Sequence, residues 1–440
     1  MSAGLLLAAS LVCGFAPLGL AAWVALVVGA CALLLPLVAY VSWRLRDRVL
    51  PLRWWIGIIL VALAARVAVC FSGPILSDDI GRYHWDGKVL WHGINPYLYA
   101  PHAEELDKLP LDPWDQRVNH PWYHTVYPPL SQLLFALAYR LDPSGIAGLH
   151  LLFLVAELLG FWLLWGHLGR RGSPRSGLLL LWLNPLLVFE GYAPGHLDLW
   201  LLPCVALLIG AVLERRAVST GLALGCIALI KPLALLFTPA CMRELGWRKT
   251  VLAGIVCVAL IAVGYAPFLA AGERLYSSML RMANEWTFNG SLAAWLESLH
   301  PTKHAVAHKR AALVMLSLIL LATWLARDWL ARAIGASLAW IICTPVLFPW
   351  YLIGFAPLVA LRGDPALLVA FALAPLSELV VVEWQLAGHW HPLGWASWVL
   401  YLAFYGVLLG ALVSRRGVFA PKNVASGLDG QRSSRNAPKT

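Results

Sequence analysis

The chain has 440 residues, of which 60% are hydrophobic and only 13% are charged, and its formal net charge is +10. Soluble domains carry about 25% charged residues, so this composition excludes one water-soluble globule and favours many bilayer spans of roughly 20 apolar residues each. The basic residues lie in short clusters between apolar runs. That pattern indicates membrane orientation by the positive-inside rule, and we expect no nucleic-acid partner.

The first two apolar runs, residues 4–20 and 22–43, predict a helical hairpin. They do not read as a cleaved signal peptide, because no basic region precedes them. The hairpin is followed by four arginines that we expect on the cytoplasmic side, namely Arg44, Arg46, Arg48 and Arg53. The run 54–72 then crosses outward and delivers the polar segment 73–127, a long loop with an excess of acids, to the outer face.

The next segment, residues 128–141, is short for a membrane span. If it crosses, the later basic clusters fall outside; if it only dips in, they fall inside, which the charge rule favours. Residues 218–240 must then enter and return as a hairpin that breaks at Lys231-Pro232, since proline removes a backbone donor. A lysine at that depth lines a polar cavity or snorkels from a tilted helix.

The remaining apolar runs alternate cleanly across the membrane. They lie at about 250–270, 311–326, 333–348, 350–361, 366–382 and 395–413. The fold class is therefore all-α and polytopic, with roughly 11–14 membrane segments in a single domain over residues 1–416. Residues 417–440 are rich in Ser, Asn, Gly, Lys and Arg and predict a disordered cytoplasmic tail.

Neither a metal nor another cofactor is indicated by the sequence. The eight cysteines lie in or beside apolar runs and form no C-x-x-C pair, so we expect no disulfide framework and no zinc site. His196 with Asp198, and His84 with Asp86, have only a weak metal-ligand spacing. The first of these pairs can equally belong to an ordinary turn.

Five separate segments bring polar or aromatic residues to the predicted outer face. These residues are Asp78, Asp79, Arg82 and Asp86 in the first loop, His196 and Asp198 in the turn 191–198, Lys231 at the hairpin apex, Asn289 in the loop 271–310, and Trp350 and Tyr351 at the turn after residue 348. Solvated loops do not require such convergence. We expect these residues to form one site.

The residue types in this set suit glycosyl transfer. Adjacent carboxylates at a membrane boundary can act as a general base, because partial loss of water raises a carboxyl pKa. Arg82, Lys231 and His196 can hold a phosphate leaving group. Aromatic residues of the first loop can stack on sugars or anchor the loop at the lipid headgroups.

The acidic residues also have structural interpretations. Asp78 or Asp79 can cap the helix that begins near Ile80, because aspartate is a preferred N-cap residue. Asp86 can form an ordinary helix ion pair with Arg82, four residues earlier. Capping by one aspartate does not exclude catalysis by the other.

Four strings of the sequence resemble a known family. They are SDDIGRYHWDGKVLWHGINPYLYAP, VNHPWYHTVYPPLSQLLFAL, EWTFNGSL and PWYL, of which the first two are specific and the last two short. Together they resemble the GT-C fold of integral-membrane glycosyltransferases, in its bacterial polyprenyl-phosphate-dependent mannosyltransferase-like branch, from about residue 54 to 415. The hairpin at 4–43 is an addition, and it moves the acidic loop from the first helix to the third.

The resemblance implies an inverting transfer with an aspartate base in the first loop and cations on the donor phosphate. The base role falls on Asp78 or Asp79, and Asp78 is favoured because its spacing to Asp86 resembles the arrangement of the family. The sequence departs from the family pattern in two places. Its second acid, Asp79, is directly adjacent, and Gly81 stands where a tyrosine is expected.

We therefore expect a hexosyltransferase, with mannose the favoured sugar, on the outer face of the bacterial cytoplasmic membrane. Its donor is a polyprenyl-phosphate sugar, its acceptor a glycan or lipid hydroxyl, and membrane lipid surrounds it. A transporter or flippase of lipid-linked sugars is the alternative, and it predicts related halves that the sequence does not show. An O-antigen polymerase or ligase is a third possibility, but those enzymes usually depend on arginines in their outer loops.

Overall fold

The computed structural model describes residues 1–440 except 17, 73–75, 300–302, 389, 391–392 and 414–440. Helices dominate this part of the chain, and within it an isolated β-bridge joins Phe288 to Val346. The predicted all-α class is confirmed. The tail predicted over 417–440 lies outside the described residues.

Seven of the described helical segments are long and apolar enough to span a membrane. They are Leu20–Arg44, Leu52–Cys70, Ala147–Arg170, Trp247–Leu275, His304–Leu325, Pro365–Ala387 and Gly394–Ala411. Shorter apolar helical segments accompany them at Ser2–Phe15, Ser176–Tyr192, Leu197–Leu213, Ala217–Ile230 and Trp329–Cys343. The chain is thus a multi-pass membrane protein, and these segments agree with the predicted polytopic fold.

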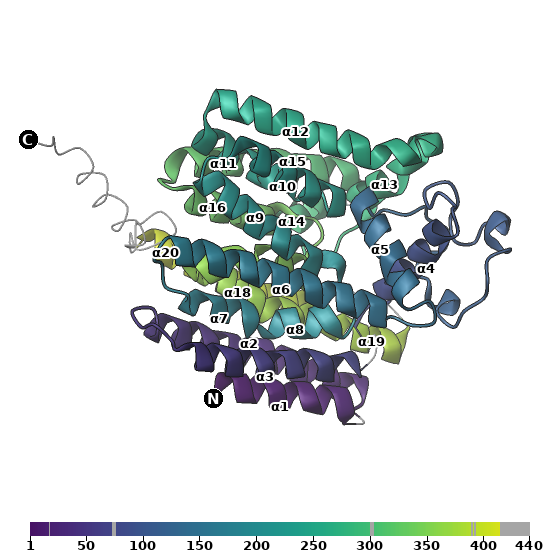
Figure 1. The fold of residues 1–440 in the computed structure, drawn as a ribbon. Helices are drawn as coiled ribbons and strands as arrows, with labels where there is room; N and C mark the ends of the chain where they lie inside the picture. Colours follow the sequence, from purple (N-terminus) through teal and green to yellow (C-terminus); the bar gives the residue numbers. More distant parts are fainter. Residues whose placement is uncertain (17, 73–75, 300–302, 389, 391–392, 414–440) are drawn as a thin grey trace, which may run out of the picture.

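The N-terminal hairpin consists of α1 (Ser2–Phe15) and α2 (Leu20–Arg44), and it packs on α3 (Leu52–Cys70). These three helices lie together along the lower edge of the bundle in Figure 1. Their apolar residues run almost without interruption, as expected for helices that face lipid and protein at once. The predicted hairpin over 4–43 is therefore present, two residues longer at its start.

One end of the bundle carries α4 (Asp79–Trp91) and α5 (Pro129–Leu141), with the short helices η1 (Glu104–Leu106) and η2 (Asp115–Arg117) between them. Figure 1 shows this unit to the right of the long helices. We call residues 76–128 the first polar loop. It includes α4 and ends where α5 begins.

Helix α5 is too short to cross a membrane as a single span. Its 13 residues rise only about 20 Å at 1.5 Å per residue, whereas a bilayer core is about 30 Å thick. Helix α6 (Ala147–Arg170) starts directly beside α5, since a Cβ on Gly148 would lie 2.1 Å from the carbonyl oxygen of Ala138. The length of α5 favours the topology in which residues 128–141 stay at one face.

The middle of the chain contains the predicted broken hairpin. The helices of this middle part are η3 (Ser176–Leu178), α7 (Leu179–Trp182), α8 (Pro185–Tyr192), η4 (Leu197–Trp200), α9 (Leu201–Leu213), α10 (Ala217–Ile230), α11 (Ala234–Leu245) and α12 (Trp247–Tyr265). Helices α10 and α11 form the hairpin. Helix α10 stops at Lys231, whose backbone is extended, and α11 restarts after Pro232. The far ends of α10 and α11 meet again, because Arg215 lies 3.5 Å from Glu244.

The C-terminal part completes the bundle. Its helices are η5 (Ala266–Leu275), α13 (Ser277–Glu285), α14 (Leu292–Leu299), α15 (His304–Leu325), α16 (Trp329–Cys343), η6 (Pro349–Phe355), α17 (Ala356–Arg362), α18 (Pro365–Leu373), η7 (Ala374–Glu378), α19 (Leu379–Ala387) and α20 (Gly394–Val413). Asp328 caps α16 and Asp364 caps α18 through side-chain bonds to backbone N–H groups. Such caps satisfy donors that the first helical turn leaves free.

A buried ion pair links α3 to the helices behind it. Arg66 donates from Nε to Glu157 on α6 at 2.6 Å and from Nη2 to the carbonyl oxygen of Trp182 at 3.0 Å. The hydroxyl of Tyr192 donates to the same carboxylate at 2.7 Å. Both charged side chains are at most 1% exposed, so each depends on the other for its charge balance.

Removal of one partner of this pair should destabilise the protein strongly. We expect Arg66→Met to lower the free energy of unfolding by about 3–5 kcal/mol, because it leaves Glu157 buried without a counter-charge. The double variant Arg66→Met/Glu157→Leu should recover most of that loss. Thermal unfolding of the purified variants in one detergent measures both effects, and equal stability of the single and double variants would contradict the interpretation.

Candidate active site

The two adjacent aspartates stand at the start of α4 and share one amide. Asp78 occupies the N-cap position, but its side chain makes no capping bond. Instead, Nδ2 of Asn119 donates to Asp78 at 2.9 Å and to Asp79 at 2.8 Å. The capping interpretation is therefore not realised by Asp78. Both carboxylates instead accept hydrogen bonds from Asn119, about 40 positions later in the chain.

Gly81 explains how Asn119 reaches the acids. A Cβ at this position would lie 2.3 Å from the carbonyl oxygen of Arg117, so only glycine lets the loop approach α4 so closely. Two residues after Arg117, the chain places Asn119 over the aspartates. Gly81, which departs from the expected tyrosine, is thus required by the local packing.

His196 faces Asp79 from the opposite side. Its Nδ1 lies 3.9 Å from Oδ2 of Asp79, and its side chain is fully buried. The ring stacks on Trp350 with centroids 3.9 Å apart and planes inclined by 10°. Among the described residues, neither ring nitrogen has a hydrogen-bond partner, which is costly for a buried polar group. The site therefore has unused hydrogen-bonding capacity beside the acid.

Lys231 and Asp198 form the second charged pair of the site. Nζ of Lys231 donates to Oδ1 of Asp198 at 2.6 Å, and it lies 3.5 Å from the ring centroid of Tyr351. Asp198 is 1% exposed, whereas the lysine side chain is 22% exposed. The ammonium thus sits at the helix break, stabilised by an anion and an aromatic face, and the lysine side chain as a whole keeps some exposure.

The surroundings of Asp79 raise the pKa of its carboxyl group. Burial raises the pKa of its carboxyl to about 6, and the negative charge of Asp78 raises it as well. The hydrogen bond from Asn119 and the charge of Lys231 act in the opposite direction. The Asp79 side chain is 25% exposed. A carboxylate with this pKa is ionised at neutral pH yet basic enough to accept a proton.

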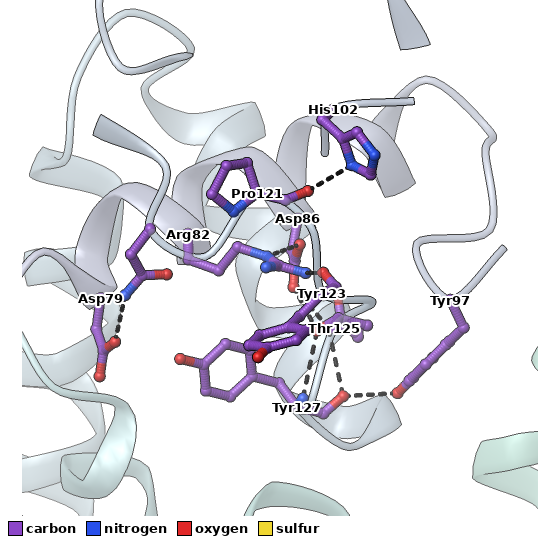
Figure 2. Close-up of polar contacts among 11 residues, drawn as sticks. Asp79, Arg82, Asp86, Tyr97, His102, Pro121, Tyr123, Thr125 and Tyr127 are labelled. Carbon is purple, nitrogen blue, oxygen red and sulfur yellow. Dashed lines mark hydrogen bonds and ion pairs between the residues drawn. The ribbon is translucent and has the colours of Figure 1, made fainter. Parts of the chain in front are cut away.

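Arg82 and Asp86 belong to a neighbouring network. Arg82 donates from Nε to Asp86 at 2.8 Å and from Nη2 to the carbonyl oxygen of Tyr123 at 3.0 Å. Thr125 at 2.5 Å and Gln132 at 3.1 Å donate to the other oxygen of Asp86. Figure 2 shows Arg82 between Asp86 and Tyr123. The helix ion pair is present, and it fixes the segment 123–127 against α4.

Asn289 also makes contacts apart from the acids. It adopts a left-handed backbone with φ of 51°. Its Oδ1 accepts from Ser397 at 2.7 Å, its Nδ2 donates to the carbonyl oxygen of Leu347 at 3.4 Å, and its own carbonyl oxygen accepts from Tyr401 at 2.7 Å. These bonds tie the segment after α13 to α20 and to the strand-like segment before η6.

The structure therefore brings together most of the residues that were predicted to share a site. The cluster consists of Asp78, Asp79, His196, Asp198, Lys231, Trp350 and Tyr351. Asn119 was not predicted, because one asparagine among the histidines and aromatics of its loop carries no distinctive spacing. Within the described residues, no group of three or more His, Cys, Asp or Glu side chains is placed to hold a metal ion.

Comparison with known proteins gives one match. Residues 3–246, more than half of the chain, match the family described as Alpha-(1->6)-mannopyranosyltransferase, N-terminal domain. No curated protein and no solved structure is similar enough to match. The matched region contains the acid pair, Asn119, His196 and Lys231, whereas Trp350 and Tyr351 lie beyond it.

Gly81→Ala tests whether the loop must approach α4 this closely. The added methyl group meets backbone, so the segment around Arg117 has to shift and carry Asn119 away from the acids. We expect kcat/KM for mannosyl transfer to fall by about tenfold or more. Gly57→Ala in α3, where nothing lies within 4 Å of a new Cβ, is the matched control. Equal activity of the two variants would show that the close approach is unimportant.

Proposed function

The chain belongs to the α-(1→6)-mannopyranosyltransferase family, and from this we propose that it moves mannose from polyprenyl-phosphate mannose to a hydroxyl of a glycan or lipid acceptor. The transfer proceeds by a single displacement with inversion, at the outer face of the bacterial cytoplasmic membrane. The observation that carries this proposal is the pairing, in one site, of a tuned carboxylate with a partly open cation.

The cation supports a phosphate-bearing donor. Lys231 lies at the break of an apolar hairpin, with its ammonium held by Asp198 and its side chain partly exposed. His196, beside it, keeps both ring nitrogens free of partners among the described residues. Together they offer donors to the oxygens of a phosphate. A lipid-linked phosphate suits their position, because its chain stays in the bilayer while its headgroup reaches the break.

The carboxylate that we assign as the base is Asp79. The sequence favoured Asp78, but Asp78 is exposed, whereas Asp79 is partly buried, carries the raised pKa and faces His196. Partial burial makes a carboxylate a stronger base than one in bulk water. Asp78 then contributes by its charge, which favours proton uptake by its neighbour.

The proposed reaction balances with these groups alone. The acceptor oxygen attacks the anomeric carbon of mannose and loses its proton to Asp79, while the bond from that carbon to the phosphate oxygen breaks. The polyprenyl phosphate departs with the electron pair, next to Lys231 and His196. Inversion converts a β-linked mannosyl phosphate into an α-linked product, which agrees with the linkage in the family description.

The distribution of basic residues supports an outward-facing site. Helix α6 has 24 residues and is therefore about 36 Å long, so its Arg170 end lies far from α5 and the acid pair. The basic residues near that end are Arg170, Arg171, Arg175, Arg215 and Arg216. Basic clusters favour the cytoplasmic side, which leaves the acids on the outer side.

Charge-removing substitutions of the two aspartates test the base assignment. We expect Asp79→Asn to lower kcat by roughly 10²–10⁴-fold, as is typical when a general base is lost, and Asp78→Asn to have a smaller effect. The assay uses purified protein with radiolabelled polyprenyl-phosphate mannose. Full transfer by both variants would overturn the mechanism, and movement of lipid-linked mannose across vesicles without transfer would favour a flippase.

The pH dependence of transfer provides an independent test. Only the ionised carboxylate of Asp79 accepts a proton, so kcat/KM should fall as the pH drops below about 6, the value to which burial raises the pKa of Asp79. Asn119→Ala removes the hydrogen bond that lowers this pKa, so the midpoint should move to higher pH. Asn284→Ala, an exposed amide bonded to its own helix, should leave the midpoint unchanged. If the midpoint of the pH profile were the same in Asn119→Ala as in the unaltered protein, Asp79 would be excluded as the titrating base.

A further inference from the structure

A cavity of about 610 Å³ lies next to the residue that holds the acid pair, because His120 in its lining directly follows Asn119. It is lined by His102, His120, Trp122 and Tyr123 of the first polar loop and by Arg281 of α13. The proposed chemistry uses none of these side chains. The cavity is large enough to admit sugar rings, so its lining decides what it can bind.

Aromatic faces dominate that lining. Trp122 is 70% exposed and stacks on His102 with ring centroids 6.0 Å apart. His120 lies between Tyr123, at 5.8 Å, and Trp286, at 5.0 Å. Exposed aromatic faces next to polar edges suit the apolar face of a pyranose, whose hydroxyl groups point outward.

The charges of the cavity favour a neutral ligand. Arg281, the one arginine or lysine among the five lining residues named above, is paired with Glu285 at 3.0 Å and lies 5.1 Å from the ring centroid of Tyr123. Burial lowers the pKa of His120, which keeps that ring neutral at pH 7. A free phosphate would find little uncompensated positive charge here, whereas a sugar needs none.

The backbone holds this lining in place. His120 adopts a left-handed conformation, with φ of 44°, and its carbonyl oxygen accepts from the N–H of Tyr123 at 2.9 Å. The ring of His102 bonds to the carbonyl oxygen of Pro121 at 2.9 Å, as Figure 2 shows, and Arg82 holds the carbonyl oxygen of Tyr123. A left-handed histidine costs free energy, so the surrounding bonds must maintain it. The cavity is therefore built before a ligand arrives.

The cavity and the cation bracket the acid pair. Oδ1 of Asp79 accepts from Asn119, the residue before His120, while its Oδ2 faces His196. A displacement with inversion needs its nucleophile and its leaving group on opposite sides of the anomeric carbon. The side next to Asn119 is therefore the one from which an acceptor hydroxyl can approach.

We propose that this cavity is the acceptor subsite and that it binds a neutral sugar of the acceptor glycan through stacking on Trp122. This inference rests on the proposed function. Arg82 then acts as a positioning residue, because it orders the segment that carries Tyr123. The acceptor that fits this subsite is an uncharged glycan.

Direct binding tests the subsite apart from catalysis. Full-length Asp79→Asn protein in lipid nanodiscs is titrated calorimetrically with α-(1→6)-linked mannotetraose, alone and with Trp122→Ala added. We expect Trp122→Ala to raise the Kd by about two- to tenfold, the range of an aromatic stacking contact, and Trp122→Phe to restore most of the affinity. Trp295→Ala, which removes another exposed tryptophan, is the control and should leave the Kd unchanged.

Kinetics on the otherwise unaltered protein separate the two proposals. Trp122→Ala should raise KM for the mannotetraose acceptor and leave KM for the polyprenyl-phosphate mannose donor and kcat nearly constant. An unchanged acceptor KM and Kd would overturn the subsite while the mechanism stands, provided that Asp79→Asn abolishes transfer. Displacement of bound mannotetraose by millimolar inorganic phosphate would also overturn it, since the cavity would then be an anion site.

Discussion

A lysine inside an apolar hairpin must find a counter-charge or another favourable polar contact, because lipid cannot solvate an ammonium group. Lys231 meets this requirement through Asp198 and the ring of Tyr351. These contacts join the end of α10 to η4, which carries Asp198, and to η6, which carries Tyr351. The charged centre thus ties together three segments that are distant in the sequence.

A close backbone contact between α4 and the first polar loop positions the groups around the acid pair. Gly81 admits the backbone of Arg117, and the loop then carries Asn119 to the carboxylates. The bonds from Arg82 and Thr125 to Asp86 hold the return of that loop. These contacts hold the first polar loop, much of which is not helical, in a fixed position beside the acid pair.

The sequence predicts the bundle well and the site unevenly. Apolar runs and basic clusters locate the helices, and the Lys231-Pro232 step locates the break, because both follow from local chemistry. Polar residues in apolar surroundings pointed to Asp79, His196, Asp198 and Lys231. Asn119 was missed because its role depends on tertiary contact across 40 residues. Asn289 was included because of its loop, yet its bonds go to Ser397 and Tyr401.

The contacts of Trp350 with His196 and of Tyr351 with Lys231 bear on where this protein can be divided into fragments. The family match ends at residue 246, but His196 rests on Trp350 and Lys231 on Tyr351. A fragment that stopped at the end of the match would contain the aspartates, His196 and Lys231. It would lack Trp350 and Tyr351, the two aromatic residues that pack against His196 and Lys231. The end of the family match is therefore not an edge of this cluster, because residues on both sides of it pack together.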